Sequence, residues 1–363
     1  MAVTEQGLLA ALTSVQDPHT GQDFVSTRAL RNVQIHGGDV AFDVELGYPA
    51  KSLLPELRRS LVAAAKGVAG VENVSVNITT KVVAHAVQRG VQLLAQVKNI
   101  IAVASGKGGV GKSTTAANLA LALAAEGASV GVLDADIYGP SQPMMMGINR
   151  RPESDDGKTM EPLAHYGVQV MSIGFLVDQD EAMIWRGPMA TQALEQLLRQ
   201  PNWKDLDYLI IDMPPGTGDI QLTLSQRVPM TGAVIVTTPQ DIALLDAKKG
   251  IKMFEKVGVP ILGIVENMAV HVCSNCGQVE HIFGADGGKK MAADYGMDYL
   301  GALPLDMSIR LQADSGKPTV VADPDGEVAQ IYKKVAREVA VKIARQAKDF
   351  SSKFPTISIS KNT

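Results

Sequence analysis

One short segment of this 363-residue chain carries residues whose types and spacing suit the binding of phosphate. It reads GKGGVGKS from Gly106 to Ser113, with Gly111, Lys112 and Ser113 as its last three residues. Glycines let consecutive backbone N–H groups turn inward with no Cβ in the way, and a helix that follows offers its positive end to an anion. Because an apolar run precedes the segment and a helical pattern follows it, the spacing predicts a P-loop.

The side chains of this loop indicate Mg²⁺ and ATP as ligands. Lys112 would place a positive charge on the outer phosphates, and Ser113 would offer its hydroxyl oxygen to the metal ion. Asp212, which ends the apolar run YLIID, is the expected second anchor for the ion or its waters. The amide of Asn267 offers both a donor and an acceptor to an adenine edge, although alone it reads as a cap or turn residue. The expected nucleotide contacts are Gly106, Lys107, Gly108, Gly109, Val110, Gly111, Lys112, Ser113, Thr114 and Asn267.

The second chemical feature is a pair of cysteines, Cys273 and Cys276, which are the only two in the chain. Their spacing lets both sulfurs face one metal centre, and iron-sulfur binding, zinc binding and a redox disulfide compete as interpretations. A redox pair usually begins a helix in a thioredoxin-like setting, which is not found here. An iron-sulfur cluster prefers four thiolate ligands and one chain has only two, so the second copy in a two-fold dimer would supply the other two. Zinc across a dimer, or with His271 or His281 within one chain, fits the same count.

The elements that must position these residues follow from the apolar pattern. Short, nearly continuous apolar runs alternate with helical segments after residue 98, which predicts a mostly parallel sheet covered by helices on both faces. The expected strands are residues 100–104, 130–133, 168–173, 209–211, 233–237 and 261–265. A polar stretch at 149–159 predicts a surface loop.

The first 95 residues read differently and predict a small α+β domain. A short helix comes first, then a turn at Asp17-Pro18 and a β-hairpin over 33–46 with Gly37-Gly38 in its middle. A helical pattern at 49–66 and a strand at 71–78 follow. Residues 80–97 are expected to be a linker with some helix in it.

The end of the chain has a helical pattern over residues 328–350, with apolar side chains on one face. We expect it to pack on the large domain, although a basic amphipathic helix could instead lie on an anionic membrane. The expected division is therefore a small domain with its linker at 1–95, the P-loop domain at 96–350 and a polar tail at 351–363.

Composition narrows the classes of partner. Charged residues make up 20% of the chain and its formal net charge is -4, so strong attraction to nucleic acid is not expected. The N-terminus has no basic region before its short apolar stretch, which argues against a secretory signal or a membrane span. We expect a cytoplasmic protein without stable membrane association.

The loop sequence KGGVGKST has an additional lysine, Lys107, and resembles the deviant Walker A loop of a family of ATPases. That family includes the Min and Par positioning proteins, the nitrogenase iron protein and the Mrp-type (ApbC-type) iron-sulfur carriers. The segments DADIYGPS, IIDMPPGTGD and a late CxxC after GIVENM are similar to the Mrp-type branch, over about residues 98–345. The N-terminal part resembles the MIP18-like domain that many bacterial members carry.

This resemblance implies roles for particular residues. Lys107 would act across a two-fold axis on the nucleotide of a homodimeric partner, and Lys112 would act within its own chain. Asp136 would lie in the first switch loop near the metal and the attacking water, and Pro214 to Gly218 would sense the γ-phosphate. Cys273 and Cys276 would be the cluster ligands.

The resemblance also implies a function. The chain is expected to be an ATPase that holds a [4Fe-4S] cluster across a homodimer and passes it to apo iron-sulfur client proteins, with zinc as the other occupant of the cysteine pair. One alternative is a positioning ATPase that cycles between surfaces, which would leave the CxxC unexplained. Another is a reductase in which ATP gates electron transfer, but the cluster cysteines of the nitrogenase iron protein lie far apart in sequence.

Overall fold

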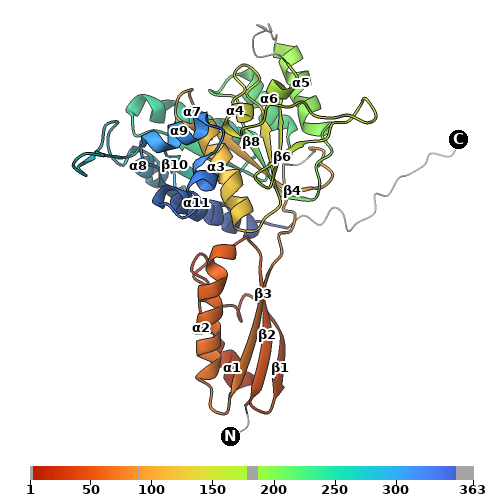
Figure 1. Ribbon diagram of the computed structural model, residues 1–363, viewed down its shortest axis with the longest axis vertical. Helices are drawn as coiled ribbons and strands as arrows, with labels where there is room; N and C mark the ends of the chain where they lie inside the picture. The colour runs from red at the N-terminus through yellow and green to blue at the C-terminus, as the bar shows by residue number, and fades with distance from the viewer. Residues whose placement is uncertain (1–2, 89, 178–186, 349–363) are drawn as a thin grey trace, which may run out of the picture.

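The computed structural model describes residues 3–88, 90–177 and 187–348. A large α/β body carries a small N-terminal α+β part that projects from one end (Figure 1). This is the predicted fold class. None of the helices in the described ranges is long and apolar enough to cross a membrane.

The body is built on an eight-stranded sheet of order β13-β10-β9-β4-β8-β5-β7-β6. All neighbouring pairs are parallel except β6 with β7 at one edge. The six predicted strands are all present, and β6 and β13, which are three and four residues long, were not predicted. The bounds are β4 Val97–Ala104, β5 Val130–Asp134, β6 Leu163–His165, β7 Val168–Ser172, β8 Leu206–Asp212, β9 Gly232–Thr237, β10 Ile261–Glu266 and β13 Tyr299–Ala302.

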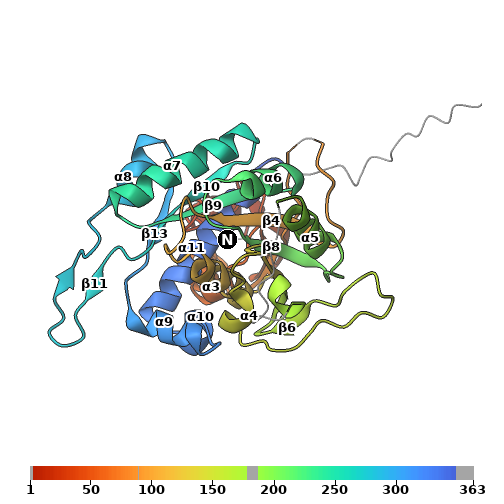
Figure 2. The same cartoon turned by 90° about the horizontal axis from the view of Figure 1, so that it is seen from above.

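Helices cover both faces of this sheet, as the continuous burial of its strands requires (Figure 2). One face carries α3 (Lys112–Ala125), α4 (Gln142–Met145), α9 (Met307–Asp314), α10 (Thr319–Ala322) and α11 (Glu327–Ala344). The other carries α5 (Gly187–Arg199), α6 (Asp219–Arg227), α7 (Asp241–Lys256) and α8 (Gly287–Asp294). A short 3-10 turn, η2 (Ile173–Phe175), follows β7. The predicted surface loop at 149–159 is present.

The N-terminal part packs two helices on a three-stranded sheet. Strands β1 (Leu30–His36) and β2 (Asp39–Leu46) form the predicted antiparallel hairpin, and β3 (Asn73–Thr80) pairs parallel with β2. Alternate residues of β2 are buried under α1 (Glu5–Leu12) and α2 (Leu54–Lys66), which a 3-10 turn, η1 (Lys51–Leu53), precedes. The alternating apolar residues of β2 therefore form its buried face.

Two expectations for connecting segments need correction. No helix forms in residues 81–88 or 90–96, because long-range contacts hold this linker extended: the N–H of Ala86 donates to Ala347 O and the Gln88 amide donates to Ser225 O. The last helix, α11, ends at Ala344 rather than continuing to 350. Its apolar face packs on α3, as expected for a helix of the body. The predicted polar tail lies outside the described residues.

Parallel pairing brings the carboxyl ends of β4, β5 and β8 together at one end of the sheet. Asp134 of β5 lies opposite Asp212 of β8, and β8 in turn pairs with β4, which leads into the glycine loop. Loops at this edge of an open α/β sheet are where ligands bind. The glycine loop and Asp212 therefore lie together at the carboxyl ends of the central strands.

Candidate functional site

Two glycines of the loop between β4 and α3 have no room for a side chain. A Cβ on Gly106 would lie 2.1 Å from the backbone carbonyl carbon of Asp246 in α7, and one on Gly111 would lie 2.1 Å from the side-chain nitrogen Nδ2 of Asn267. Gly109 and Gly111 both have φ of 82°, a left-handed conformation that favours glycine. The glycines thus shape a concave loop before the first turn of α3, where N–H groups remain free for an anion.

Lys112 and Asp212 form a buried ion pair at the floor of this loop. Their side chains are 6% and 0% exposed, and Lys112 also donates to the hydroxyl of Ser113 at 3.1 Å. Gln142 Nε2 donates to the other carboxylate oxygen of Asp212 at 2.9 Å and to the Ser113 carbonyl at 3.1 Å. The lysine expected at the outer phosphates is therefore held against the aspartate expected at the metal.

A second carboxylate, Asp134, lies beside this pair. Its Oδ2 accepts the backbone N–H groups of Ser141 and Gln142, each at 3.0 Å, and the Ser172 hydroxyl. Burial, and then the negative charge of Asp212, raise the pKa of Asp134. Asp134 thus has a structural role, because its hydrogen bonds fix the chain that follows β5.

Asp136 lies two residues further on, and its N–H donates to Asp134 at 3.2 Å. Burial raises the pKa of its carboxyl, while the positive charge of Lys112 acts in the opposite direction. The Asp136 carboxyl therefore lies within the electrostatic influence of Lys112. Its role beside the reacting phosphate stays a prediction.

The donors at this site fit magnesium. A hydroxyl and a carboxylate, from Ser113 and Asp212, are the hard oxygen ligands that Mg²⁺ takes alongside waters and phosphate oxygens. Two buried oxygens beside them, Ser141 Oγ and Gln142 Oε1, have no hydrogen-bond partner within the described part of the chain. Buried polar atoms normally have a hydrogen-bond partner, and the waters around a bound ion would donate hydrogen bonds to these two oxygens.

Lys107, the additional lysine, differs from Lys112 in its surroundings. Its backbone carbonyl accepts the Ser105 hydroxyl at 2.9 Å, which fixes the loop. No carboxylate of the described residues lies within 4.0 Å of its ammonium group. The side chain is half-buried, and its role across a two-fold axis stays a prediction.

Asn267 follows β10 and contacts the P-loop itself. Its Nδ2 donates to the carbonyl of Val110 at 2.9 Å, so that one amide proton supports the loop. The contact with adenine that the sequence suggests stays a prediction.

The predicted γ-phosphate sensor, residues 214–218, lies against the same loop. The N–H of Gly216 donates to Ser105 O at 3.1 Å, and Gly216 has φ of 95°, with open space around its Cα. This segment therefore borders the phosphate loop.

The cysteine pair lies in a small hairpin that projects from the body beyond the β10 and β13 side of the sheet (Figure 2). Strands β11 (His271–Val272) and β12 (Val279–Glu280) form its stem, and the N–H of Gly277 donates to Cys273 O at 2.8 Å. Backbone N–H groups of Asn275 and Cys276 donate to the Cys273 sulfur and lower the pKa of that thiol, as does the Cys276 side chain. Cys273 is half-buried and Cys276 is exposed, so the turn presents two thiols outward.

Neither histidine adds a third ligand to this pair. Nδ1 of His271 is bonded to Leu305 O and Nδ1 of His281 to Ala269 O, each at 3.0 Å. Within the described ranges, no group of three or more histidine, cysteine or carboxylate side chains is placed to hold a metal ion. The two sulfurs therefore have no third ligand in place beside them within the described residues, and the interpretation as a zinc site with a histidine of the same chain stays a prediction.

One residue of the site and one that supports its helix could not be found from the sequence. Gln142 joins Ser113 to Asp212 although it is 70 residues from the latter, and nothing in GPSQP signals such a role. Glu126, which follows α3, accepts from Arg337 at 2.5 Å and from the Ser52 N–H at 2.9 Å. It thereby ties the far end of the P-loop helix to the N-terminal part.

A parallel sheet with this glycine loop, its lysine and an aspartate at the next strand end defines a P-loop NTPase. Residues 96–340 match the family described as NUBPL iron-transfer P-loop NTPase, and residues 5–78 match the iron-sulfur cluster assembly protein family. The chain belongs to the NUBPL iron-transfer P-loop NTPase family.

Relatives agree with this assignment. The iron-sulfur cluster carrier protein of Escherichia coli strain K12 is 50% identical, over 92% of this chain and 90% of its own length. The iron-sulfur cluster transfer protein NUBPL of Mus musculus is 55% identical, over 67% of this chain and 77% of its own. A solved structure of a nucleotide-binding protein from Archaeoglobus fulgidus in complex with ADP is 37% identical, with a TM-score of 0.56, over 65% of this chain and 93% of that one.

Proposed function

We propose that this protein binds and hydrolyses ATP as a homodimer, holds a [4Fe-4S] cluster between its two copies and transfers the cluster to apo iron-sulfur proteins. The observation that carries the proposal is the cysteine turn. It places the chain's two thiols together, facing outward on a projecting hairpin, in a protein whose body is a P-loop NTPase.

The turn suits a cluster that is bound and then released. Backbone N–H groups aimed at the Cys273 sulfur stabilise its thiolate, which is the form that binds metal. Two thiolates from each of two chains complete the four that a cluster prefers. The exposure of Cys276 leaves the cargo accessible to a client protein. The names of the curated relatives, a cluster carrier and a cluster transfer protein, support the same function.

The nucleotide site supports hydrolysis through positioning and charge. When ATP binds, Lys112 exchanges the carboxylate of Asp212 for the outer phosphates. Asp212 and Ser113 would then be the residues that hold Mg²⁺, and the ion would stabilise negative charge on the phosphate oxygens. Asp136 orients the attacking water, and Lys107 of the second copy supplies positive charge to the transferred phosphoryl group.

A short covalent path joins the two sites. Asn267, just after β10, touches the P-loop through the Val110 carbonyl, and Cys273 follows six residues later, just after β11. Between them, Ala269 is held to Leu303 O at 3.0 Å. A change in the loop on nucleotide binding would therefore reach the base of the cysteine hairpin through one continuous segment.

Anaerobic reconstitution with iron and sulfide tests the cargo. The wild type should gain a broad absorbance band in the visible region and should bind about four iron and four sulfide ions per two chains. The Cys273→Ser/Cys276→Ser variant should gain neither the band nor the iron and sulfide. Ser274→Ala, in the same turn, is the matched control and should load normally. A band of equal intensity in the double variant, or zinc in place of iron in protein purified without oxygen, would refute the cargo assignment.

A further inference from the structure

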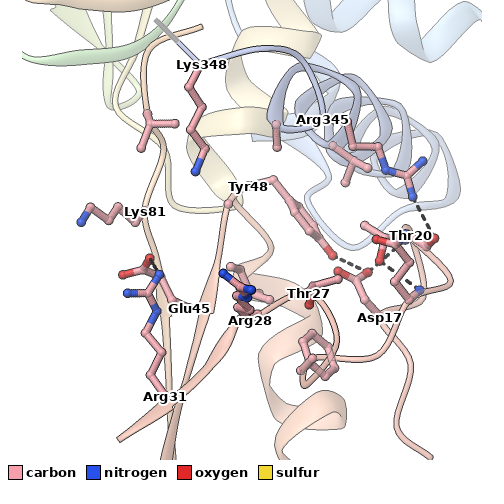
Figure 3. Close-up of a pocket in the computed structure, with 18 of the residues that line it drawn as sticks. Asp17, Thr20, Thr27, Arg28, Arg31, Glu45, Tyr48, Lys81, Arg345 and Lys348 are labelled. Carbon is pink, nitrogen blue, oxygen red and sulfur yellow. Dashed lines mark hydrogen bonds and ion pairs between the residues drawn. The ribbon is translucent and has the colours of Figure 1, made fainter. Parts of the chain in front are cut away.

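A cavity of about 270 Å³ lies where the N-terminal part meets the end of α11 (Figure 3). Its walls come from the segment before β1, from β1 and β2, from the linker and from the last turn of α11 and the residues after it. It is separate from the P-loop and from the cysteine hairpin, and neither proposed site uses any residue that lines it.

The charge of the cavity wall is strongly unbalanced. Five basic side chains line it: Arg28, Arg31, Lys81, Arg345 and Lys348. Only two carboxylates face them, Asp17 and Glu45.

Both carboxylates are already occupied. Asp17 Oδ1 accepts the Tyr48 hydroxyl at 2.8 Å and the His19 N–H at 2.8 Å, and Glu45 pairs with Arg31 at 3.1 Å. Arg345 donates to Thr20 O at 2.8 Å.

Arg28, Lys81 and Lys348 therefore remain without a carboxylate within 4.0 Å, among the residues that the structure describes. Like charges gathered around one hollow repel each other and attract an anion.

Two of these cations come from opposite walls of the cavity. Figure 3 shows Lys348 reaching down from the α11 side, and Arg28 on the N-terminal part below it. Arg28 has φ of 58°, a left-handed conformation that costs a non-glycine residue free energy. An arginine therefore occupies a backbone conformation that would favour glycine.

The wall also holds one buried polar atom without a partner. Asn99 donates through Nδ2 to Val83 O and Asp207 O, so its Oδ1 must accept the proton of His85 Nδ1, at 3.0 Å. That tautomer leaves Nε2 of His85 as an acceptor. This nitrogen has no partner within the described residues, and the side chain is 2% exposed.

We propose that this cavity binds a small organic anion that carries at least two negative charges and a hydroxyl group. Arg28 and Lys348 would hold the anionic groups, and His85 Nε2 would accept the hydroxyl proton. The volume is near the lower end of ligand sites, about 300–1,000 Å³, and so fits a small metabolite rather than a peptide. Because its walls belong to both parts of the chain, the bound anion would hold them together.

The test uses the full chain saturated with Mg²⁺ and ADP, so that the P-loop cannot take up the probe. Isothermal titration compares 3-phosphoglycerate, a phosphate ester, with malate, a hydroxydicarboxylate, and with sulfate. At least one organic probe should bind one to one and about tenfold or more tightly than sulfate, since each charge-assisted hydrogen bond adds affinity. Which of the two binds identifies the ligand as a phosphate ester or a polycarboxylate.

Arg28→Glu/Lys348→Glu should lower the affinity for that probe by about tenfold or more. Arg59→Glu/Lys66→Glu makes the same change of charge on exposed residues of α2 and should leave it unchanged. If the first double variant does not fold by circular dichroism, Lys348→Glu alone replaces it, with the same expectation. Binding of both organic probes no tighter than sulfate, or equal affinity in the cavity variant and its control, overturns the proposal.

Discussion

The buried ion pair of Lys112 and Asp212 makes the substitution Asp212→Asn informative. Asp212 accepts hydrogen bonds from two donors, Lys112 and Gln142, and asparagine offers only one acceptor oxygen and no charge. Removing one partner of a buried pair costs about 3–5 kcal/mol, and the nearby Asp134 carboxylate places this case at the low end, about 3 kcal/mol. In a domain of this size that corresponds to a melting temperature lower by roughly 6–12 °C.

Differential scanning calorimetry without nucleotide measures this loss, with Asp219→Asn as an exposed control that should melt like the wild type. ATP in the presence of a chelator should raise the melting temperature more in Asp212→Asn than in the wild type, because the phosphates replace the missing negative charge beside Lys112. The double variant Lys112→Met/Asp212→Asn should lose less than the sum of the two single variants. A single variant that melts within a degree of the wild type, or strictly additive losses, would refute the reasoning.

Three further predictions concern other parts of the molecule. Lys107→Ala should keep its affinity for ATP within a few-fold yet hydrolyse it at least about 10³-fold more slowly, measured by phosphate release against Lys66→Ala; equal rates would exclude a role in trans. In Cys276→Ser, iodoacetamide should alkylate Cys273 with a lower pH midpoint in the folded protein than in urea, because backbone N–H groups lower the pKa of its thiol; identical midpoints would contradict this. Burial and then the charge of Arg337 lower the pKa of His19. As the pH falls, His19 therefore takes up its proton in the unfolded chain before it does so in the folded one, and the free energy of unfolding should fall as the pH drops through about 6.5. The urea midpoint should fall less in His19→Gln between pH 7.5 and 5.5, and an unchanged pH dependence would count against it.

Much of this architecture could be predicted because its signals are local. The order of strand, glycine loop and helix lies within about 25 residues, and the six principal strands are continuous apolar runs. The period-two pattern of β2 likewise needs only its own residues. Features that depend only on the spacing of nearby residues could therefore be predicted from the sequence.

The remaining features depend on contacts between distant residues. Gln142 reaches Asp212 across the sheet edge, and Arg337 reaches Glu126 across 211 positions. The linker has a mixed pattern, and its extended form depends on contacts with Ala347 and Ser225. Strands β6 and β13 are too short to show a pattern and take their form from the neighbours that they pair with. The cavity likewise exists only because α11 returns to the N-terminal part.

The most direct test of a shared cluster is native mass spectrometry of reconstituted protein under argon. The proposed arrangement predicts a species whose mass is that of two chains plus one Fe₄S₄ unit. In the variant in which Cys273 and Cys276 are both serine, this species should be absent, and any dimer that depends on the cluster should be absent with it. A cluster carried by a single chain, or a dimer that binds one cluster per subunit, would contradict it.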